Sequence, residues 1–113
     1  MNELNEYQRD AARTLTIVPG AEKGQLAIMG LGLTGESGEV AEMLKKYLGH
    51  GHPLDLKKLE RELGDVLWYV SAIATLNGLS LASIVAVNVM KLKARYPDGW
   101  SVERSKNREV GDV

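Results

Sequence analysis

The sequence predicts an all-α protein, a four-helix antiparallel bundle that assembles as a homo-oligomer. No segment sustains the alternation of apolar and polar residues that is typical of strands. Four segments carry apolar residues at helical spacing, and breakers rich in Gly, Pro or Asn separate them. A chain of 113 residues fits one domain, in which short connections make neighbouring helices antiparallel. We assign residues 1–100 to this helical domain and residues 101–113 to a charged, unpatterned C-terminal tail.

Each predicted helix has a recognisable start or stop. The first ends ahead of Pro19, because proline disfavours helix in the residue before it. Asp55 and Ser80 are the N-caps of the third and fourth helices, and Asn77-Gly78 stops the third. The predicted helices are Glu3–Leu15, Lys23–Leu48, the segment from Asp55 to Asn77, and the segment from Ser80 to Tyr96.

Two features of these helices are unusual. Residues 30–38 of the second helix hold four glycines, each of which lowers helix stability by about 0.5–1 kcal/mol relative to alanine. They indicate either close approach of another helix or a ligand, or a kink or break before Thr34. Residues 66–76 and 81–92 are apolar almost all round, so they must be buried on every side, and four short helices cannot do this without partner subunits. The four glycines are Gly30, Gly32, Gly35 and Gly38.

The composition excludes several classes of protein. Lys and Arg (14) nearly balance Asp and Glu (15), so the net charge does not indicate nucleic acid or membrane partners. The absence of cysteine excludes disulfides, zinc–thiolate sites and a cysteine nucleophile. Residues 1–6 lack the basic start and apolar core of a signal peptide, and no apolar run is long enough to span a bilayer. We therefore expect a soluble, cytoplasmic protein.

Two pairs of acidic residues are the most informative feature of the chain. Glu36 and Glu39 are three residues apart, as are Glu62 and Asp65, so on a helix each pair presents two carboxylates on one face. In an antiparallel hairpin the centres of the pairs lie roughly 17 Å and 13 Å from the loop, so the pairs can meet. Converging carboxylates are unfavourable unless protons or a hard cation neutralise them. The alternative is a solvated helix face, the ordinary place for charged residues.

If a metal binds, the donor atoms predict which one. Oxygen ligands alone suit Mg²⁺, with Mn²⁺ as a substitute, whereas di-iron bundles use Glu-x-x-His pairs, and neither acidic pair contains a histidine. His50 and His52 lie in the loop after the second helix, where we expect them to be exposed. Mg²⁺ held by carboxylates usually keeps positions open for substrate phosphates, so the site indicates phosphate chemistry.

A polar face on the fourth helix supports phosphate binding. Asn88, Lys91 and Arg95 lie at i, i+3 and i+7. The two like charges favour an anion between them, although basic residues near a helix C-terminus also stabilise its dipole. Tyr69 follows Asp65 by one helical turn. Its hydroxyl can hydrogen-bond to a phosphate oxygen, or its ring can pack against neighbouring side chains. Four more aromatic residues are candidates for stacking on a base or for packing: Tyr7, Tyr47, Trp68 and Trp100.

The chain resembles the MazG-like family of all-α nucleoside triphosphate pyrophosphohydrolases in three blocks of sequence taken together. These blocks are residues 35–42, 62–69 and 88–99. The family pattern is ExxE, a gap, then ExxD, and here the gap (residues 40–61) contains 22 residues. The resemblance covers roughly residues 5–100. Many members carry a further glutamate where this chain has Gly35, so any role of that carboxylate in activating water is missing or moved.

The resemblance implies a Mg²⁺-dependent enzyme that splits the α–β phosphoanhydride of a nucleoside triphosphate, giving a monophosphate and pyrophosphate. It implies dimers or tetramers, of which we favour the tetramer, and clearance of non-standard or excess nucleotides is the hypothesis for its role. We assign the general base to Glu39. The implied metal ligands are Glu36, Glu39, Glu62 and Asp65, and the implied substrate contacts are Tyr69, Asn88, Lys91 and Arg95. The competing hypothesis is a non-catalytic helical oligomer, a regulatory or adaptor protein whose acidic pairs lie on the surface.

Overall fold

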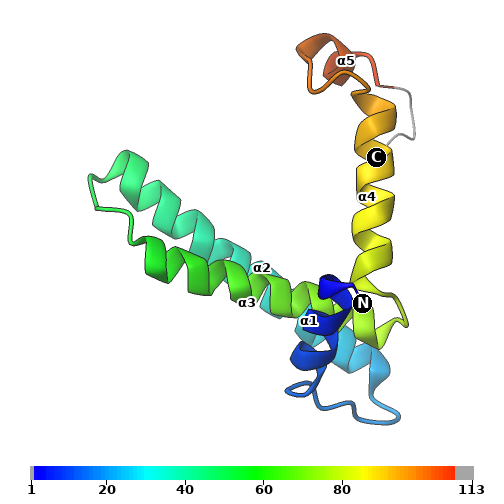
Figure 1. Cartoon of the computed structure of the whole chain (residues 1–113). Coiled ribbons are helices and arrows are strands. Elements are labelled where there is room, and N and C mark those ends of the chain that lie inside the picture. The colour runs from blue at the N-terminus through cyan, green and yellow to red at the C-terminus, as the bar shows by residue number, and fades with distance from the viewer. Residues whose placement is uncertain (1, 109–113) are drawn as a thin grey trace.

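The computed structural model describes residues 2–108, which form five helices and no strand (Figure 1). The prediction of an all-α fold is therefore confirmed. The predicted tail contains a short helix, because Ser101 caps it by accepting a hydrogen bond from the backbone N–H of Arg104 at 3.1 Å; residues 109–113 of that tail lie outside the described residues. The helices are α1 (Glu3–Ala12), α2 (Glu22–Gly49), α3 (Leu56–Leu76), α4 (Leu81–Arg95) and α5 (Val102–Lys106).

Side-chain caps begin two helices where the sequence predicted them. Asp55 Oδ1 accepts a hydrogen bond from the backbone N–H of Lys58 at 3.1 Å, and Ser80 Oγ accepts one from Ser83 at 3.1 Å. Gly78 follows α3 with a φ of 68°, a left-handed conformation that glycine adopts without steric strain. The predicted extents of α2, α3 and α4 are confirmed to within one residue at each end.

The first helix ends earlier than predicted, at Ala12 instead of Leu15. The indole Nε1 of Trp68 donates to the carbonyl oxygen of Ala11 at 3.3 Å and to Thr14 Oγ1 at 2.8 Å. The Thr14 hydroxyl also donates to the Ala11 carbonyl, at 2.9 Å. These bonds occupy a carbonyl that a continuing helix would use. A contact with a residue 57 positions away thus ends the helix.

α2 and α3 form a long antiparallel hairpin (Figure 1). α2 is one continuous helix, so a break before Thr34 is wrong, whereas a kink at that point stays a prediction. A Cβ atom on Gly32 would overlap the ring of Tyr69 on α3, so close helix approach explains this glycine. A Cβ on any of the other three glycines singled out in α2 would meet nothing within 4 Å, and the structure gives no packing reason for them.

α1 lies across the end of this hairpin and fixes the start of α4. The side-chain amide of Gln8 donates to Thr75 Oγ1 at 3.1 Å and to the Leu79 carbonyl at 2.9 Å. Its Oε1 accepts a bond from the backbone N–H of Leu81 at 2.8 Å, and Asn5 Oδ1 accepts the next N–H of α4 at 3.3 Å. Side chains of α1 therefore satisfy the first backbone donors of α4.

α4 leaves the hairpin at a steep angle. The chain turns by 105° between α3 and α4, and α4 projects away from the hairpin in Figure 1. The predicted four-helix antiparallel bundle is consequently not formed within one chain, because the bonds from Gln8 and Asn5 hold the start of α4 in this direction. No single described helix is long and apolar enough to cross a membrane; the bent pair of α3 and α4 passes a test of length and composition only.

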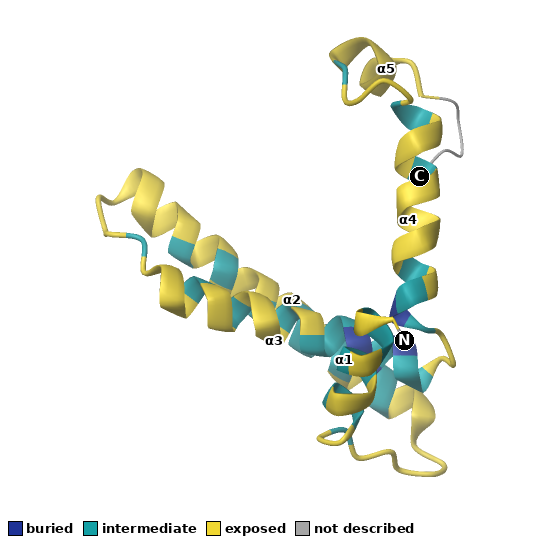
Figure 2. Cartoon of the chain, viewed as in Figure 1, coloured by how far each residue is buried: buried dark blue, intermediate teal, exposed yellow. Residues whose placement is uncertain are grey.

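The single chain buries few of its residues. Among the described residues only Ser71, Ala72, Ala74 and Leu81 are buried, where α1, α3 and the start of α4 meet (Figure 2). The chain exposes 8482 Å², whereas a compact protein of 12.4 kDa exposes about 6100 Å². Its radius of gyration is 17.2 Å, against about 13 Å for a compact chain of this length. The isolated chain is therefore extended, with little core of its own.

Candidate metal centre

The α2–α3 hairpin brings carboxylates of both acidic pairs together. One carboxylate oxygen from each of Glu36, Glu62 and Asp65 lies within 4.8 Å of the other two. Glu36 comes from α2, and the other two come from α3, about one turn apart. Glu36 and Glu62 are half-buried, whereas Asp65 is exposed. The cluster therefore has a sheltered side between the helices and an open side toward solvent.

Glu39, the fourth predicted acid, lies beside these three. A hydrogen bond with Glu62, together with the negative charge of Glu62, raises the pKa of the Glu39 carboxyl above its ordinary value. A hydrogen bond with Glu36 and the positive charge of Lys58 act in the opposite direction. Because Glu39 is itself exposed, its raised pKa reflects the crowding of carboxylates more than burial.

Two oxygens of the cluster are buried without a partner. Glu36 Oε2 and Glu62 Oε2 are shielded from solvent and accept no hydrogen bond from the described residues. A buried carboxylate oxygen is unfavourable unless a donor or a cation satisfies it. A donor set made only of carboxylate oxygens fits a hard cation such as Mg²⁺ or Mn²⁺. The residues present are thus suited to a divalent metal ion.

Two tyrosines lie at the end of the cluster away from the hairpin loop. Tyr69 is half-buried and packs over Gly32, and its ring meets that of Trp68 edge-on with centroids 5.0 Å apart. Burial and the charge of Asp65 raise the pKa of Tyr7 on α1. From the sequence, Tyr7 was a candidate only for stacking on a base or for packing. No local pattern could have linked it to the acids, because α1 meets α3 only in the folded chain.

The three predicted substrate contacts on α4 lie elsewhere in the single chain. Asn88 is exposed, and Lys91 and Arg95 are half-buried. Since α4 projects away from the hairpin, one chain does not bring them to the carboxylates (Figure 1). His50 and His52 are exposed in the α2–α3 loop with ring centroids 6.5 Å apart, as predicted.

Comparison with known proteins identifies the family. The family model described as the MazG nucleotide pyrophosphohydrolase domain matches residues 25–100. This chain belongs to the MazG family. The matched region contains all of α3 and α4 and most of α2, so both acidic motifs fall inside the MazG domain. The resemblance seen in the sequence is thereby confirmed.

A phage protein provides a second comparison. This MazG-family chain is 34% identical over 106 residues to the Gene 37 protein of Mycobacterium phage L5, and the match covers 87% of this chain and 93% of the phage protein. No solved structure matches the chain. The name of the phage protein states no activity. The family match alone therefore indicates the chemistry: MazG domains are nucleotide pyrophosphohydrolases that typically use a divalent metal.

Proposed function

We propose that this MazG-family protein hydrolyses a nucleoside or deoxynucleoside triphosphate between its α and β phosphates, giving a monophosphate and pyrophosphate, with Mg²⁺ as cofactor. One observation carries the proposal: oxygens of Glu36, Glu62 and Asp65 converge within 4.8 Å, and two oxygens of the cluster are buried without partners. The match to a nucleotide pyrophosphohydrolase domain supports it. Clearance of non-standard or excess nucleotides is the role that fits this reaction.

The residues divide between holding the metal and moving a proton. Glu36, Glu62 and Asp65 would hold Mg²⁺, or Mn²⁺ in its place. Glu39 is outside the group of converging oxygens but hydrogen-bonds to Glu62 and Glu36, and we propose it as the fourth ligand. When bound, the ion neutralises phosphate oxygens and lowers the pKa of water. The chain contributes a donor set whose spacing is fixed by two packed helices, so little reorganisation is needed when substrate arrives.

Glu39 is the general base of the proposed reaction. Its carboxylate is exposed and lies beside Glu36 and Glu62, which gives it access to water at the proposed metal site. Glu39 takes a proton from the attacking water, whose oxygen forms a bond to the α phosphorus. The bond from that phosphorus to the bridging oxygen breaks, and the bridging oxygen leaves with pyrophosphate. Glu39 thus takes the place of the carboxylate that is absent at Gly35.

A nucleotide panel with product analysis tests the function. With Mg²⁺ present, we expect triphosphates to yield a monophosphate and pyrophosphate, and we expect EDTA to stop the reaction. Glu39→Gln should lower kcat by about 10²–10⁴-fold, the usual contribution of a general base. Glu60→Gln is the matched control, because Glu60 is exposed on α3 and lies outside the cluster.

Two results would contradict the proposal. Release of a diphosphate and orthophosphate would place cleavage at the wrong bond. The absence of Mg²⁺-dependent product from every nucleotide, with no rise in Tm on adding Mg²⁺, would favour the non-catalytic helical oligomer.

We also propose that the protein acts as a homo-oligomer, a tetramer in preference to a dimer. The surface in excess of that of a compact monomer is about 2400 Å² per chain, which is in the range that obligate interfaces bury. Large apolar side chains are exposed along α4, including Val87 and Met90. A second copy that covers α4 would also allow Asn88, Lys91 and Arg95 to reach a carboxylate cluster and, with Tyr69, to contact the substrate.

A further inference from the structure

The turn between α2 and α3 holds both histidines of the chain. His50 and His52 are separated by Gly51, and the sequence contains no other histidine and no cysteine. Divalent ions of borderline softness, such as Zn²⁺, prefer imidazole nitrogen and thiolate sulfur, whereas Mg²⁺ prefers oxygen. The side-chain donors that suit Zn²⁺ best are therefore gathered at this turn, apart from the carboxylate cluster.

The backbone of the turn fixes both histidines. His50 follows the last residue of α2, and its backbone N–H donates to the carbonyl oxygen of Lys46 at 3.1 Å. The backbone N–H of His52 donates to the same oxygen at 3.1 Å. Between them Gly51 has a φ of 70°, a left-handed conformation that glycine adopts without steric strain, and Pro53 restricts the next residue. These bonds hold the two backbones together and leave both side chains unused.

The two rings lie close together on the exposed side of this turn. Their centroids are 6.5 Å apart and their planes are inclined at 60°. Both residues are exposed, and neither ring makes a hydrogen bond or an ion pair with the described residues. A tetrahedral ion with Zn–N bonds of about 2.0–2.1 Å would hold two imidazole centroids roughly 5 Å apart. Rotation of the exposed side chains closes this difference without disturbing the backbone bonds.

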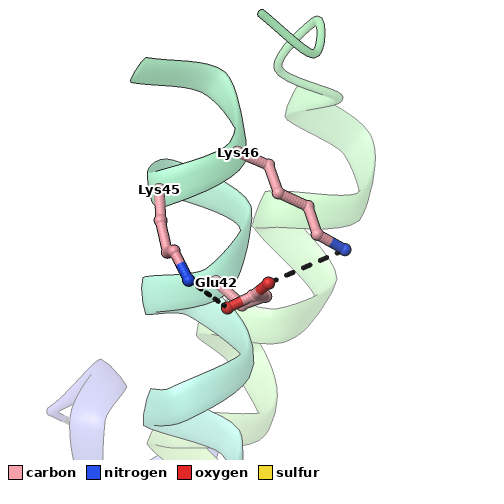
Figure 3. A network of polar contacts seen from close by, with 3 residues as sticks. All are labelled: Glu42, Lys45 and Lys46. Atoms are coloured by element: carbon pink, nitrogen blue, oxygen red, sulfur yellow. Dashed lines mark ion pairs between the residues drawn. The ribbon is translucent and has the colours of Figure 1, made fainter. Parts of the chain in front are cut away.

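The lysines nearest the turn on α2 are paired with a carboxylate. Nζ of Lys45 lies 4.0 Å and Nζ of Lys46 lies 3.8 Å from carboxylate oxygens of Glu42, and Figure 3 shows both side chains directed toward it. Glu42 precedes the two lysines by about one turn of the helix. The pairing therefore draws both positive charges back along α2, away from a cation at His50.

We propose that His50 and His52 together bind one divalent transition-metal ion, with Zn²⁺ as the ion that fits best. Two imidazoles leave two positions of a tetrahedral ion open to water or to an outside ligand. Glu39, the member of the carboxylate cluster closest to the turn on α2, lies eleven residues before His50, roughly 16 Å along the axis at 1.5 Å per residue. The hairpin thus carries two separate metal sites of different chemistry. This second site does not rest on the proposed function.

Nuclear magnetic resonance of the imidazole groups tests the site, because the chain has only two of them to observe. Zn²⁺ is added to the untagged protein in the presence of excess Mg²⁺, which occupies the carboxylate cluster. We expect the signals of both rings to shift together and to reach their end point at one Zn²⁺ per chain. His50→Gln should raise the Zn²⁺ concentration that shifts the remaining ring by about tenfold or more, because the second ligand is no longer held beside the first. His52→Gln should have the same effect on the ring of His50.

Glu62→Gln is the control, because it alters the carboxylate cluster and leaves the turn intact. Both rings should respond to Zn²⁺ in this variant as they do in the wild type. A response that is lost in Glu62→Gln would place the ion in the carboxylate cluster and overturn the proposal.

The remaining outcomes also decide the matter. A shift of one ring alone, or an unchanged Zn²⁺ requirement in the histidine variants, overturns the joint site. An end point of one Zn²⁺ per two chains assigns the ion to a contact between chains and overturns it as well. Glutamine keeps the backbone N–H groups that bond to Lys46, so circular dichroism should show unchanged helix content. His50→Gln should also keep the Mg²⁺-dependent release of pyrophosphate, so the two metal sites are tested separately.

Discussion

At the scale of single residues, the charge around Glu39 couples the stability of the protein to pH. The hydrogen bond and charge of Glu62 favour the protonated form of Glu39, which raises its pKa above the ordinary value of 4.5. The folded chain then binds more protons than the unfolded chain in the pH range above 4.5. This contribution to stability is complete below that pH and is lost as the pH rises through the raised pKa.

We therefore expect the metal-free protein to lose stability as the pH rises from about 4.5 toward neutrality. Glu39→Gln should have a higher Tm than the wild type at neutral pH in EDTA, because glutamine cannot ionise, and the difference should vanish in acid. Thermal denaturation across this pH range measures both effects. Glu60→Gln should match the wild type throughout, and a Glu39→Gln protein less stable than the wild type at neutral pH would refute the role of charge crowding.

The spacing of the acids predicted that the two pairs face each other, and three of the four predicted carboxylates converge, whereas Glu39 is outside that group. Glu36, Glu62 and Asp65 meet because periodicity and a short loop fix both the face and the register of each helix. The proximity of Tyr7 to Asp65 could not be predicted, since it depends on how α1 docks. The place of Lys58 beside Glu39 depends on the rotation of α3 against α2, which the sequence pattern does not specify.

At the scale of the helices, the contact between Gly32 and Tyr69 sets how closely α2 and α3 approach. The tyrosine ring occupies the space that a side chain at position 32 would need. The same ring meets that of Trp68 edge-on, with centroids 5.0 Å apart. Gly32 therefore lowers the helix propensity of α2 but allows α2 and α3 to pack closely beside the carboxylate cluster.

Gly32→Ala should destabilise the protein by about 1–3 kcal/mol through overpacking, measured by chemical denaturation. Gly30→Ala, where the added methyl meets nothing within 4 Å, should instead be neutral or stabilise by up to about 1 kcal/mol. In a Tyr69→Ala background, Gly32→Ala should lose its penalty, because the clashing ring is gone. A penalty that persists in that background would show that the ring is not its cause.

Helix boundaries were predictable where local chemistry sets them. Asp55 and Ser80 cap α3 and α4 through bonds to residues three positions ahead, which any reading of the sequence can anticipate. The end of α1 was not predictable, because Trp68 captures the Ala11 carbonyl from across the fold. A long-range contact outweighed the helical pattern that continues to Leu15.

At the scale of the whole molecule, the exposed apolar surface supports the proposed assembly with a partner chain. Met90 on α4 is 70% exposed and Leu48 on α2 is 80% exposed, far from the four buried residues of the single chain. Burial of about 2400 Å² per chain would bring the accessible surface to that of a compact protein. We expect folding and assembly to be coupled for this reason.

The Tm should consequently rise with protein concentration, and the molar mass in solution should be a multiple of 12.4 kDa, four times that value for the proposed tetramer. Met90→Asp should lower both the mass and the Tm if another chain covers α4. Lys57→Asp, at an exposed position on α3, serves as the control and should change neither. Light scattering after gel filtration measures the mass. A monomeric wild type whose Tm is independent of concentration would contradict coupled assembly.

The path of α4 was the part of the fold that the sequence could not predict. Helical periodicity indicated a fourth helix that is apolar almost all round over residues 81–92, and a short turn suggested that it folds back. Its direction depends on bonds from Gln8 and Asn5, more than 70 positions earlier in the chain, to its first backbone donors. Apolar residues at helical spacing can pack against another helix of the same chain or against a second chain. Their spacing therefore does not predict the direction of α4.

The bonds that tie Trp68 to α1 also give the protein a built-in optical probe. This indole donates to Ala11 and Thr14 and lies three residues after Asp65, whereas the only other tryptophan, Trp100, is 69% exposed. In a Trp100→Phe background, emission would come from a single fluorophore at the junction of two helices. Ligand-driven displacement of α1 could then be followed in real time, without an attached dye.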